Sequence, residues 1–244
     1  MAPTLIVLGA AVLMIALELL ATGRRWPHVP GWIGRALLLN VMQAAIVFLS
    51  GLTWDRWFPQ LRLWELSSLG TVAGAAIGYL TITFVYYWWH RARHEVPFLW
   101  RWLHQVHHSP QRIEIITSFY KHPFEFIING ALSSFVLYAL AGLTPAAATL
   151  AVTLTGLAEL FYHWNIRTPY WLGFFIQRPE SHCVHHREGW HRSNYADIPL
   201  WDMLFGTFDN PRLDEYTCGF GVDREAHLPA MLLGRDVNVQ RNDT

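Results

Sequence analysis

The pattern H-x-x-H-H occurs twice in this chain of 244 residues, as HQVHH at 104–108 and as HCVHH at 182–186. Residues at i, i+3 and i+4 share one face of a helix, so each copy would present three imidazoles together. At this histidine content, two copies would arise by accident in roughly one chain in a thousand. The repeat therefore indicates a functional histidine cluster, and metal binding is the chemistry that such a cluster serves.

Further histidines extend the cluster. His90 and His94 are separated by three residues, and His163 lies between the two H-x-x-H-H copies. The candidate metal ligands are His90, His94, His104, His107, His108, His163, His182, His185 and His186. Nine imidazoles are too many for one ion, whereas two ions with four or five ligands each fit the number. Imidazole suits Fe, Zn, Cu and Ni, so the ligand type alone does not select the metal.

The rest of the chain is typical of a membrane protein, because 52% of it is hydrophobic and only 15% is charged. A helix that crosses a bilayer needs about 20 mostly apolar residues. Four or five stretches approach this length: 4–22, 36–52, 66–89, 126–143 and 146–161. The last two are short and predict a helical hairpin that turns at Thr144-Pro145, either crossing the membrane or only entering it. The predicted fold is an all-α membrane bundle with a helical cap.

The positions of the positive charges predict how the chain is oriented in the membrane. Arg24, Arg25 and Arg35 follow the first stretch, a second basic group lies at 91–121, and Arg167 and Arg178 follow the fifth stretch. Alternation of the spans puts all three groups on one side, which the positive-inside rule makes cytosolic. Every clustered histidine falls on that same side. We expect an integral protein of a bacterial inner membrane or an ER-type membrane, with its histidines at the cytosolic face.

Local signals predict a short helix around each H-x-x-H-H copy. Pro97 would lie in the first turn of one helix, and Ser109-Pro110 would stop it. Pro179 would open the other helix, and Gly189 would end it. In the second helix, Cys183 would point away from the histidine face and pack against neighbouring residues.

Several classes of protein fit the sequence poorly. Lys+Arg and Asp+Glu balance at 18 each, so charge predicts no nucleic-acid partner. A membrane zinc hydrolase would need H-E-x-x-H, but His94-Glu95 is followed by Val-Pro-Phe. A non-catalytic haem protein would need single histidines within facing spans, and a metal transporter would need more polar residues inside the membrane. These remain the alternatives to a catalytic dimetal site.

The histidine motifs and their flanks resemble the fatty acid hydroxylase and sterol desaturase superfamily over about residues 70–210. His94-Glu95-Val96 followed by HQVHH-Ser109 is similar to alkylglycerol monooxygenase, and His122-Pro123-Phe124-Glu125 is similar to the HPxE stretch of methylsterol oxidases. The closing segment resembles the family at 194–195, 201–202 and 205–207. Ala196 is a departure, since many relatives have glycine there.

The resemblance implies a function. It implies two non-haem irons held by the nine histidines, O2 as co-substrate, and hydroxylation or desaturation of a lipid C–H bond, with no catalytic residues beyond the metal ligands. The predicted division of the chain is N-terminal spans at 1–65, a catalytic domain at 66–210 and a polar tail at 211–244; the resemblance supports only the catalytic domain. The lipid stays open among a sterol, a fatty acyl chain, an ether lipid and a carotenoid.

Residues around the nine histidines are candidates for supporting roles. His122 is a possible tenth ligand, an outer donor to a ligand or a structural residue. Glu159, four residues before His163, is either an acceptor for a ligand or half of an interfacial pair with an arginine. Glu95 and Asp202 are similar candidates. Glu18, inside the first stretch, is expected to reach toward Arg24 or Arg25.

The electron source is not encoded in the chain, because no Gly-x-Gly-x-x-Gly follows a strand pattern and no fused haem or iron–sulfur domain is recognisable. The resemblance implies a separate donor, a ferredoxin or cytochrome b5 with its reductase. We expect it to dock on the basic face through residues such as Arg101, Arg112 and Arg178.

Overall fold

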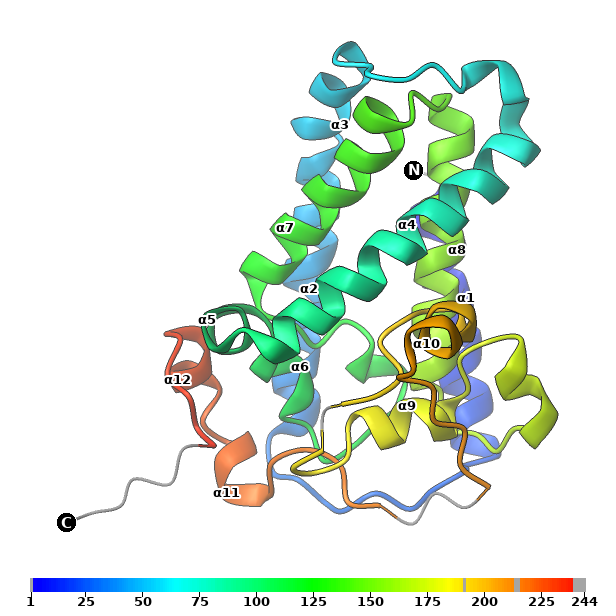
Figure 1. Cartoon of the computed structure of the whole chain (residues 1–244). Coiled ribbons are helices and arrows are strands. Elements are labelled where there is room, and N and C mark those ends of the chain that lie inside the picture. The colour runs from blue at the N-terminus through cyan, green and yellow to red at the C-terminus, as the bar shows by residue number, and fades with distance from the viewer. Residues whose placement is uncertain (1, 191, 213–215, 239–244) are drawn as a thin grey trace.

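The computed structural model describes residues 2–190, 192–212 and 216–238, and these residues form a helical bundle with a cap at one end (Figure 1). Within these ranges the only β-type pairing is one isolated bridge between Arg187 and Cys218. The long helices are α1 (Ala2–Leu20), α2 (Trp32–Ser50), α4 (Gly70–Glu95), α7 (Pro123–Ser134) with its π-helical continuation η5 (Phe135–Leu140), and α8 (Pro145–His163). The predicted all-α membrane fold is confirmed.

Four helical stretches among the described residues are long and apolar enough to cross a membrane, at 32–60, 67–95, 123–140 and 145–163. The first predicted span corresponds to α1, whose apolar part, Leu5–Leu20, is shorter. The predicted hairpin is present: Thr144 caps α8 by accepting a hydrogen bond from the backbone N–H of Ala147 at 3.2 Å. Leucines and valines cover the outer faces of α1 and α2, as expected of helices in contact with lipid.

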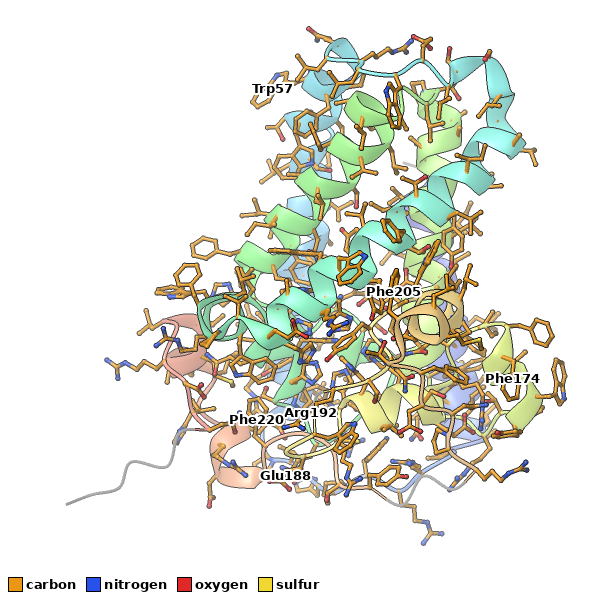
Figure 2. The ribbon with its side chains drawn as sticks, viewed as in Figure 1. Trp57, Phe174, Glu188, Arg192, Phe205 and Phe220 are labelled. Carbon is orange, nitrogen blue, oxygen red and sulfur yellow. The ribbon has the colours of Figure 1, made fainter. Side chains whose placement is uncertain are left out.

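The end of the bundle opposite the cap is closed by short elements. They are α3 (Trp54–Trp57), η1 (Phe58–Gln60) and η2 (Ser67–Leu69). Trp57 lies at this end with its ring pointing outward (Figure 2), and the side chain is 61% exposed. An exposed indole at a helix end is typical of the membrane–water interface.

The cap at the other end carries the histidine segments. Its elements are α5 (Pro97–Leu99), η3 (Trp100–His104), α6 (Gln105–His108), η4 (Ile115–Thr117), η6 (Tyr170–Phe174), α9 (Pro179–His185), α10 (Pro199–Phe205), α11 (Val222–Glu225) and α12 (Leu228–Leu232). Pro97 and Pro179 occupy first turns, as predicted. The α9 helix ends at His185, earlier than predicted, and Gly189 instead adopts a positive φ of 72° in the following turn.

Contacts on two sides bind the cap to the bundle. The ring of Phe205 in α10 stacks on Tyr87 of α4 with centroids 5.1 Å apart, and Figure 2 shows Phe205 beside that helix. Trp201, also in α10, donates a hydrogen bond from Nε1 to Thr83 at 3.0 Å. On the other side, Phe220 and Met231 are buried in a core with Trp32. The cap is therefore packed on α2 and α4 rather than tethered to them.

Gly74 and Gly78, four residues apart, let α4 approach the hairpin at α8 closely. A Cβ atom added at Gly74 would lie 3.0 Å from the Cβ of Ala147, and one added at Gly78 would lie 2.7 Å from Leu143 Cδ1. These contacts belong to a buried cluster that also contains Ile82 and Ala151. Close backbone approach fixes how the ends of α4 and α8 meet at the cap.

Gly78→Ala is expected to destabilise the protein by about 1–3 kcal/mol, because the added methyl group overpacks the contact with Leu143 and Leu137. Thermal unfolding in detergent measures the effect. Gly34→Ala is the matched control, since a Cβ there meets no atom within 4 Å. Equal unfolding temperatures for the two variants would contradict this account of the contact.

Candidate metal centre

The structure brings all nine predicted histidines together, in two groups. One group contains His90, His94, His104, His108 and His185, and the other contains His107, His163, His182 and His186. In each group the potential ligand nitrogens lie within 4.8 Å of one another. The groups adjoin: the rings of His108 and His186 stack with centroids 4.2 Å apart.

Each H-x-x-H-H copy contributes to both groups, in a reciprocal way. In the first copy, the i, i+4 pair His104 and His108 belongs to the five-histidine group, while His107 belongs to the four-histidine group. In the second copy, the pair His182 and His186 belongs to the four-histidine group, while His185 crosses to the other. The extra histidine at i+3 thus links the two groups, which a plain H-x-x-x-H would not do.

Helix ends deliver the remaining ligand candidates. The α4 helix has 26 residues, so it is about 39 Å long, which is longer than the thickness of a bilayer core, about 30 Å. Its last turns therefore carry His90 and His94 to the cap. His163 is the final residue of α8. A π-helical turn in η3 ends at His104, and such turns occur frequently at functional sites.

Hydrogen bonds from the outer ring nitrogens fix the tautomers of several histidines. His90 Nδ1 lies 2.7 Å from the carbonyl oxygen of Tyr195, His185 Nδ1 2.6 Å from that of Ser193, and His163 Nδ1 2.9 Å from that of Glu159. A carbonyl only accepts, so Nδ1 carries the proton in each case. In a neutral ring, Nε2 then presents a lone pair.

The inner nitrogens face one another at short distances. His90 Nε2 lies 2.9 Å from His104 Nε2, and His163 Nε2 lies 3.1 Å from His182 Nε2. The Nδ1 of His104 lies 3.1 Å from Glu125 Oε1 and 3.2 Å from the Arg93 guanidinium, so these two groups fix the ring from outside. A cation between the inner nitrogens would bind their lone pairs.

These distances fit metal ligation. Two nitrogens bound about 2.1 Å from one ion, at an angle of about 90°, lie about 3.0 Å apart. Burial lowers the pKa of His104, His107, His108 and His182 well below the usual histidine value. The rings are therefore neutral at pH 7, which is the form that binds metal.

Glu125 supports the five-histidine group and was not among the predicted site residues. Its side chain is fully buried, and one carboxylate oxygen contacts both His104 Nδ1 and the guanidinium of Arg93. The H-P-x-E motif at 122–125 was the available signal, because it places an acid in the first turn of α7. Its contact with His104, however, depends on how α7 packs against η3.

Asp202 also supports this group, through the loop that holds two of its rings. The carboxylate accepts hydrogen bonds from the backbone N–H of Tyr195 at 2.8 Å, from that of Ala196 at 3.0 Å and from the Thr207 hydroxyl at 2.7 Å. Burial raises the pKa of Asp202 to about 6, against the effect of these donors. The bonds fix the segment whose carbonyls receive His90 and His185.

Other candidates for supporting roles have different contacts. His122 lies outside both groups, with Nδ1 accepting from the Phe124 N–H at 3.1 Å and Nε2 3.2 Å from the Leu232 carbonyl. Glu95 pairs with Arg91 at 2.7 Å. Glu159 forms an ion pair through its carboxylate with Lys121, a lysine rather than the arginine considered from sequence, while its backbone carbonyl receives His163.

Two expectations about charged residues were wrong. Glu18 does not reach toward Arg24 or Arg25; it accepts hydrogen bonds from the backbone N–H groups of Asn165 at 2.8 Å and Ile115 at 3.2 Å. Arg178 is buried, pairing with Glu180 at 3.1 Å and bonding Asn210 at 2.7 Å. It is therefore not available for docking a partner.

A cavity of about 200 Å³ leads from the histidines into the bundle. Its inner end includes His90, His104, His107 and His182, and its walls continue along α2, α7 and α8. Ile46, Val47, Phe126 and Val152 are among the apolar residues that line it. Polar and charged residues, including Arg93, Lys121, Glu159 and Asp197, line it as well. A cavity between candidate spans that has apolar residues in its walls and reaches a metal-type site is suited to a lipid chain.

The fold and site thus define a class: helical membrane proteins with a buried histidine-rich candidate metal centre. The sequence profile described as fatty acid hydroxylase matches residues 75–207, more than half of the chain. The chain belongs to the fatty acid hydroxylase family, as its histidine motifs predict.

The named relatives include a hydroxylase, a monooxygenase and a decarbonylase. The chain is 31% identical to sphingolipid C4-hydroxylase sur2 of Schizosaccharomyces pombe over 52% of its own length and 44% of the relative's. It is 30% identical to human alkylglycerol monooxygenase over 54% and 29%, and 33% identical to very-long-chain aldehyde decarbonylase GL1-5 of Oryza sativa over 61% and 25%. The matches thus cover less than half of each relative. No solved structure matches the chain.

Asp202→Asn is expected to lower metal occupancy in the five-histidine group selectively. The amide replaces one acceptor oxygen by a donor that faces N–H groups, which loosens the carbonyls behind His90 and His185. Loss of such outer support costs about 10–100-fold in metal affinity. Elemental analysis at limiting metal should show less metal per chain than in the wild type.

Asp55→Asn is the control for this experiment, because Asp55 lies in α3 at the opposite end of the bundle, paired with Ser134. Metal content should stay at the wild-type value. If Asp202→Asn also keeps the wild-type metal content at limiting metal, the loop does not position the ligands.

Proposed function

We propose that this chain is a membrane-bound oxidoreductase that uses O2 to hydroxylate or desaturate a C–H bond of a lipid, with two non-haem irons held by the nine histidines. The observation that carries the proposal is the division of those histidines into adjoining groups of five and four with inward-facing Nε2 atoms. Family membership supports the same reaction class.

The ligand set favours metal-dependent oxidation over hydrolysis. Iron bound at such ligands supplies O2 activation and cleavage of unactivated C–H bonds, which acid–base side chains do not perform. The chain itself holds the rings neutral by burial and orients them through the carbonyls of Tyr195, Ser193 and Glu159. Glu125 contacts the ring of His104, and Asp202 fixes the loop whose carbonyls accept from His90 and His185. We infer no further catalytic side chain.

The cavity between the helices is the proposed substrate site. It includes apolar residues of α2 and α8, such as Ile46, Val47 and Val152, and ends at four of the histidines, so a lipid chain inserted from the membrane would bring a methylene group to the metals. The named relatives act on a sphingolipid, an alkylglycerol and very-long-chain aldehydes. We propose a sterol, fatty acyl or ether lipid as the substrate class here.

Electrons are proposed to come from a separate ferredoxin, or from cytochrome b5 with its reductase. The donor would dock on the cap, which we place at the cytosolic face of a bacterial inner membrane or an ER-type membrane. Of the arginines considered from sequence, Arg101 is exposed, whereas Arg112 is held by Glu114 at 2.8 Å. Arg101 is thus the better candidate for contact with an acidic partner.

Metal analysis of detergent-purified protein, expressed without a polyhistidine tag, tests the centre. About two irons per chain are expected. His107→Ala and His185→Ala each remove a ligand from a different group, so each should lose about one iron and abolish activity. His28→Ala and His227→Ala are controls at exposed positions and should retain both.

The outcomes separate the alternatives. Zinc in place of iron calls for reconstitution with Fe(II) under anaerobic conditions before activity is measured. Zinc with no activity after reconstitution would favour a hydrolase or a non-catalytic metal protein. Metal content unchanged in both ligand variants would overturn the assignment of the centre.

The reaction itself is tested by comparing lipid extracts of cells that express the wild type or His185→Ala. The wild type should accumulate a lipid with one added oxygen atom or one added double bond, because those are the two products of O2-dependent C–H cleavage. The label from ¹⁸O2 should enter a hydroxylated product. A new product with label from H2¹⁸O alone would contradict oxygenation.

A further inference from the structure

The cavity proposed as the substrate site contains ionisable side chains in addition to its histidines. Arg93, Lys121, Glu159 and Asp197 all line it. Both cations are paired with an acid other than Asp197, because Lys121 forms an ion pair with Glu159 and Arg93 forms one with Glu125. Asp197 is therefore the carboxylate of the cavity whose charge neither of these cations neutralises in an ion pair.

Asp197 has a single hydrogen-bond partner among the described residues. The hydroxyl of Tyr162 donates to its Oδ1 at 3.2 Å, which is longer than the usual O–H···O distance of about 2.7 Å. A carboxylate offers about four lone-pair sites, so one donor leaves most of them unused. Partial burial of these sites without donors costs free energy, and a donor that enters the cavity would recover it.

Tyr162 links Asp197 to the four-histidine group. It directly precedes His163 in α8, and its buried ring lies 4.4 Å from the ring of His182 between centroids. The hydroxyl at the other end of the same ring is the one that Asp197 accepts. A single aromatic ring thus spans the distance between Asp197 and these histidines. Asp197 itself belongs to neither histidine group.

The polarity of the cavity wall changes along α8, which runs from the end of the bundle closed by α3 to the cap (Figure 1). One face of the helix lines the cavity, with residues at helical spacing: Val152, Thr155, Gly156, Glu159 and Tyr162. The first three are small or weakly polar, and the last two are acidic and phenolic. The wall therefore becomes polar as it approaches the histidines.

Polar groups farther from the histidines are occupied within the protein. The Thr155 hydroxyl donates to the Val152 carbonyl at 2.8 Å, and the side-chain oxygen of Asn129 accepts from Trp89 at 2.8 Å. Gln43 Oε1 has no partner among the described residues, but neighbouring atoms cover it. Acceptor capacity that faces open space is thus concentrated at the histidine end.

We propose that Asp197 accepts a hydrogen bond from a hydroxyl group of the lipid substrate. This assignment rests on the proposed function and adds to it the polarity of the substrate and the position of the reaction. The hydrocarbon part would extend away from the histidines along Val47 and Val152. The carbon that reacts then lies close to the hydroxyl group. Among the proposed substrate classes, this favours sterols and hydroxyl-bearing ether lipids over esterified acyl chains.

Competition binding to the full chain in detergent, under anaerobic conditions that prevent turnover, tests the hydrogen bond. Tritiated octadecan-1-ol is the probe, and unlabelled octadecan-1-ol and 1-methoxyoctadecane are the competitors. The methyl ether keeps the chain and the oxygen but lacks the hydrogen that the carboxylate would accept. The alcohol should compete at a concentration about tenfold lower than the ether, as expected for a hydrogen bond to a charged acceptor.

Variants assign this difference to Asp197. Asp197→Ala should bring the two competitors close to equal, while the ether competes as it does in the wild type because the walls for the chain are intact. Asp197→Asn keeps a neutral acceptor and should retain part of the difference. Asp209→Ala is the matched control, a half-buried aspartate of the cap that does not line the cavity, and should retain all of it.

The binding outcomes are decisive without any turnover. Lack of saturable octadecan-1-ol binding, or equal competition by alcohol and ether in the wild type, would overturn the proposal even if Asp197→Ala failed to fold. A full difference retained in folded Asp197→Ala would assign it to another group, such as a bound metal, and would also overturn it. An acid that only transferred protons would give no difference. None of these results decides whether the protein is an oxygenase, so the two proposals fail separately.

The position of the modification in the lipid product is a second readout. Tandem mass spectrometry of the product should place the added oxygen or double bond within the first few carbons from the hydroxyl-bearing carbon, because one ring separates Asp197 from the histidines. A modification in the middle of the chain or at its terminal methyl group would contradict the proposed orientation of the substrate.

Discussion

The structure depends on burying nine imidazoles with several of their ring nitrogens directed at one another. Burial lowers the pKa of His104 and His182, so these rings are neutral. The Nε2 atoms of His90 and His104 lie 2.9 Å apart, so the orientation of each ring is closely constrained. The fold must hold these orientations, and the layer of hydrogen-bond partners behind the histidines does so.

That layer is built mainly from backbone. Carbonyls of Ser193, Tyr195 and Glu159 receive Nδ1–H groups, and a carbonyl can serve as an acceptor only where its own chain segment is fixed. In α8 the helix fixes Glu159. In the cap no helix covers 193–196, so Asp202 and a left-handed Asn194, with φ of 58°, fix the loop instead. A buried acid is acceptable there because it accepts several hydrogen bonds.

Much of this arrangement follows from sequence patterns that are local. Helical spacing and hydropathy predict the bundle, the hairpin at Thr144 and the gathering of histidines at one end. Tertiary contacts decide the rest. The crossing of His107 and His185 between groups depends on two short helices facing each other, and the burial of Arg178 depends on Asn210, thirty-two residues away. Helical periodicity carries no information about either contact.

The short helix α9 is contacted from two sides. His182 lines the cavity along α2 and α8, and the next residue, Cys183, packs against Trp26 in the loop that follows α1. The position of α9 therefore links the N-terminal loop to the proposed reaction site: any shift of Trp26 that moves Cys183 also moves His182, and with it the four-histidine group.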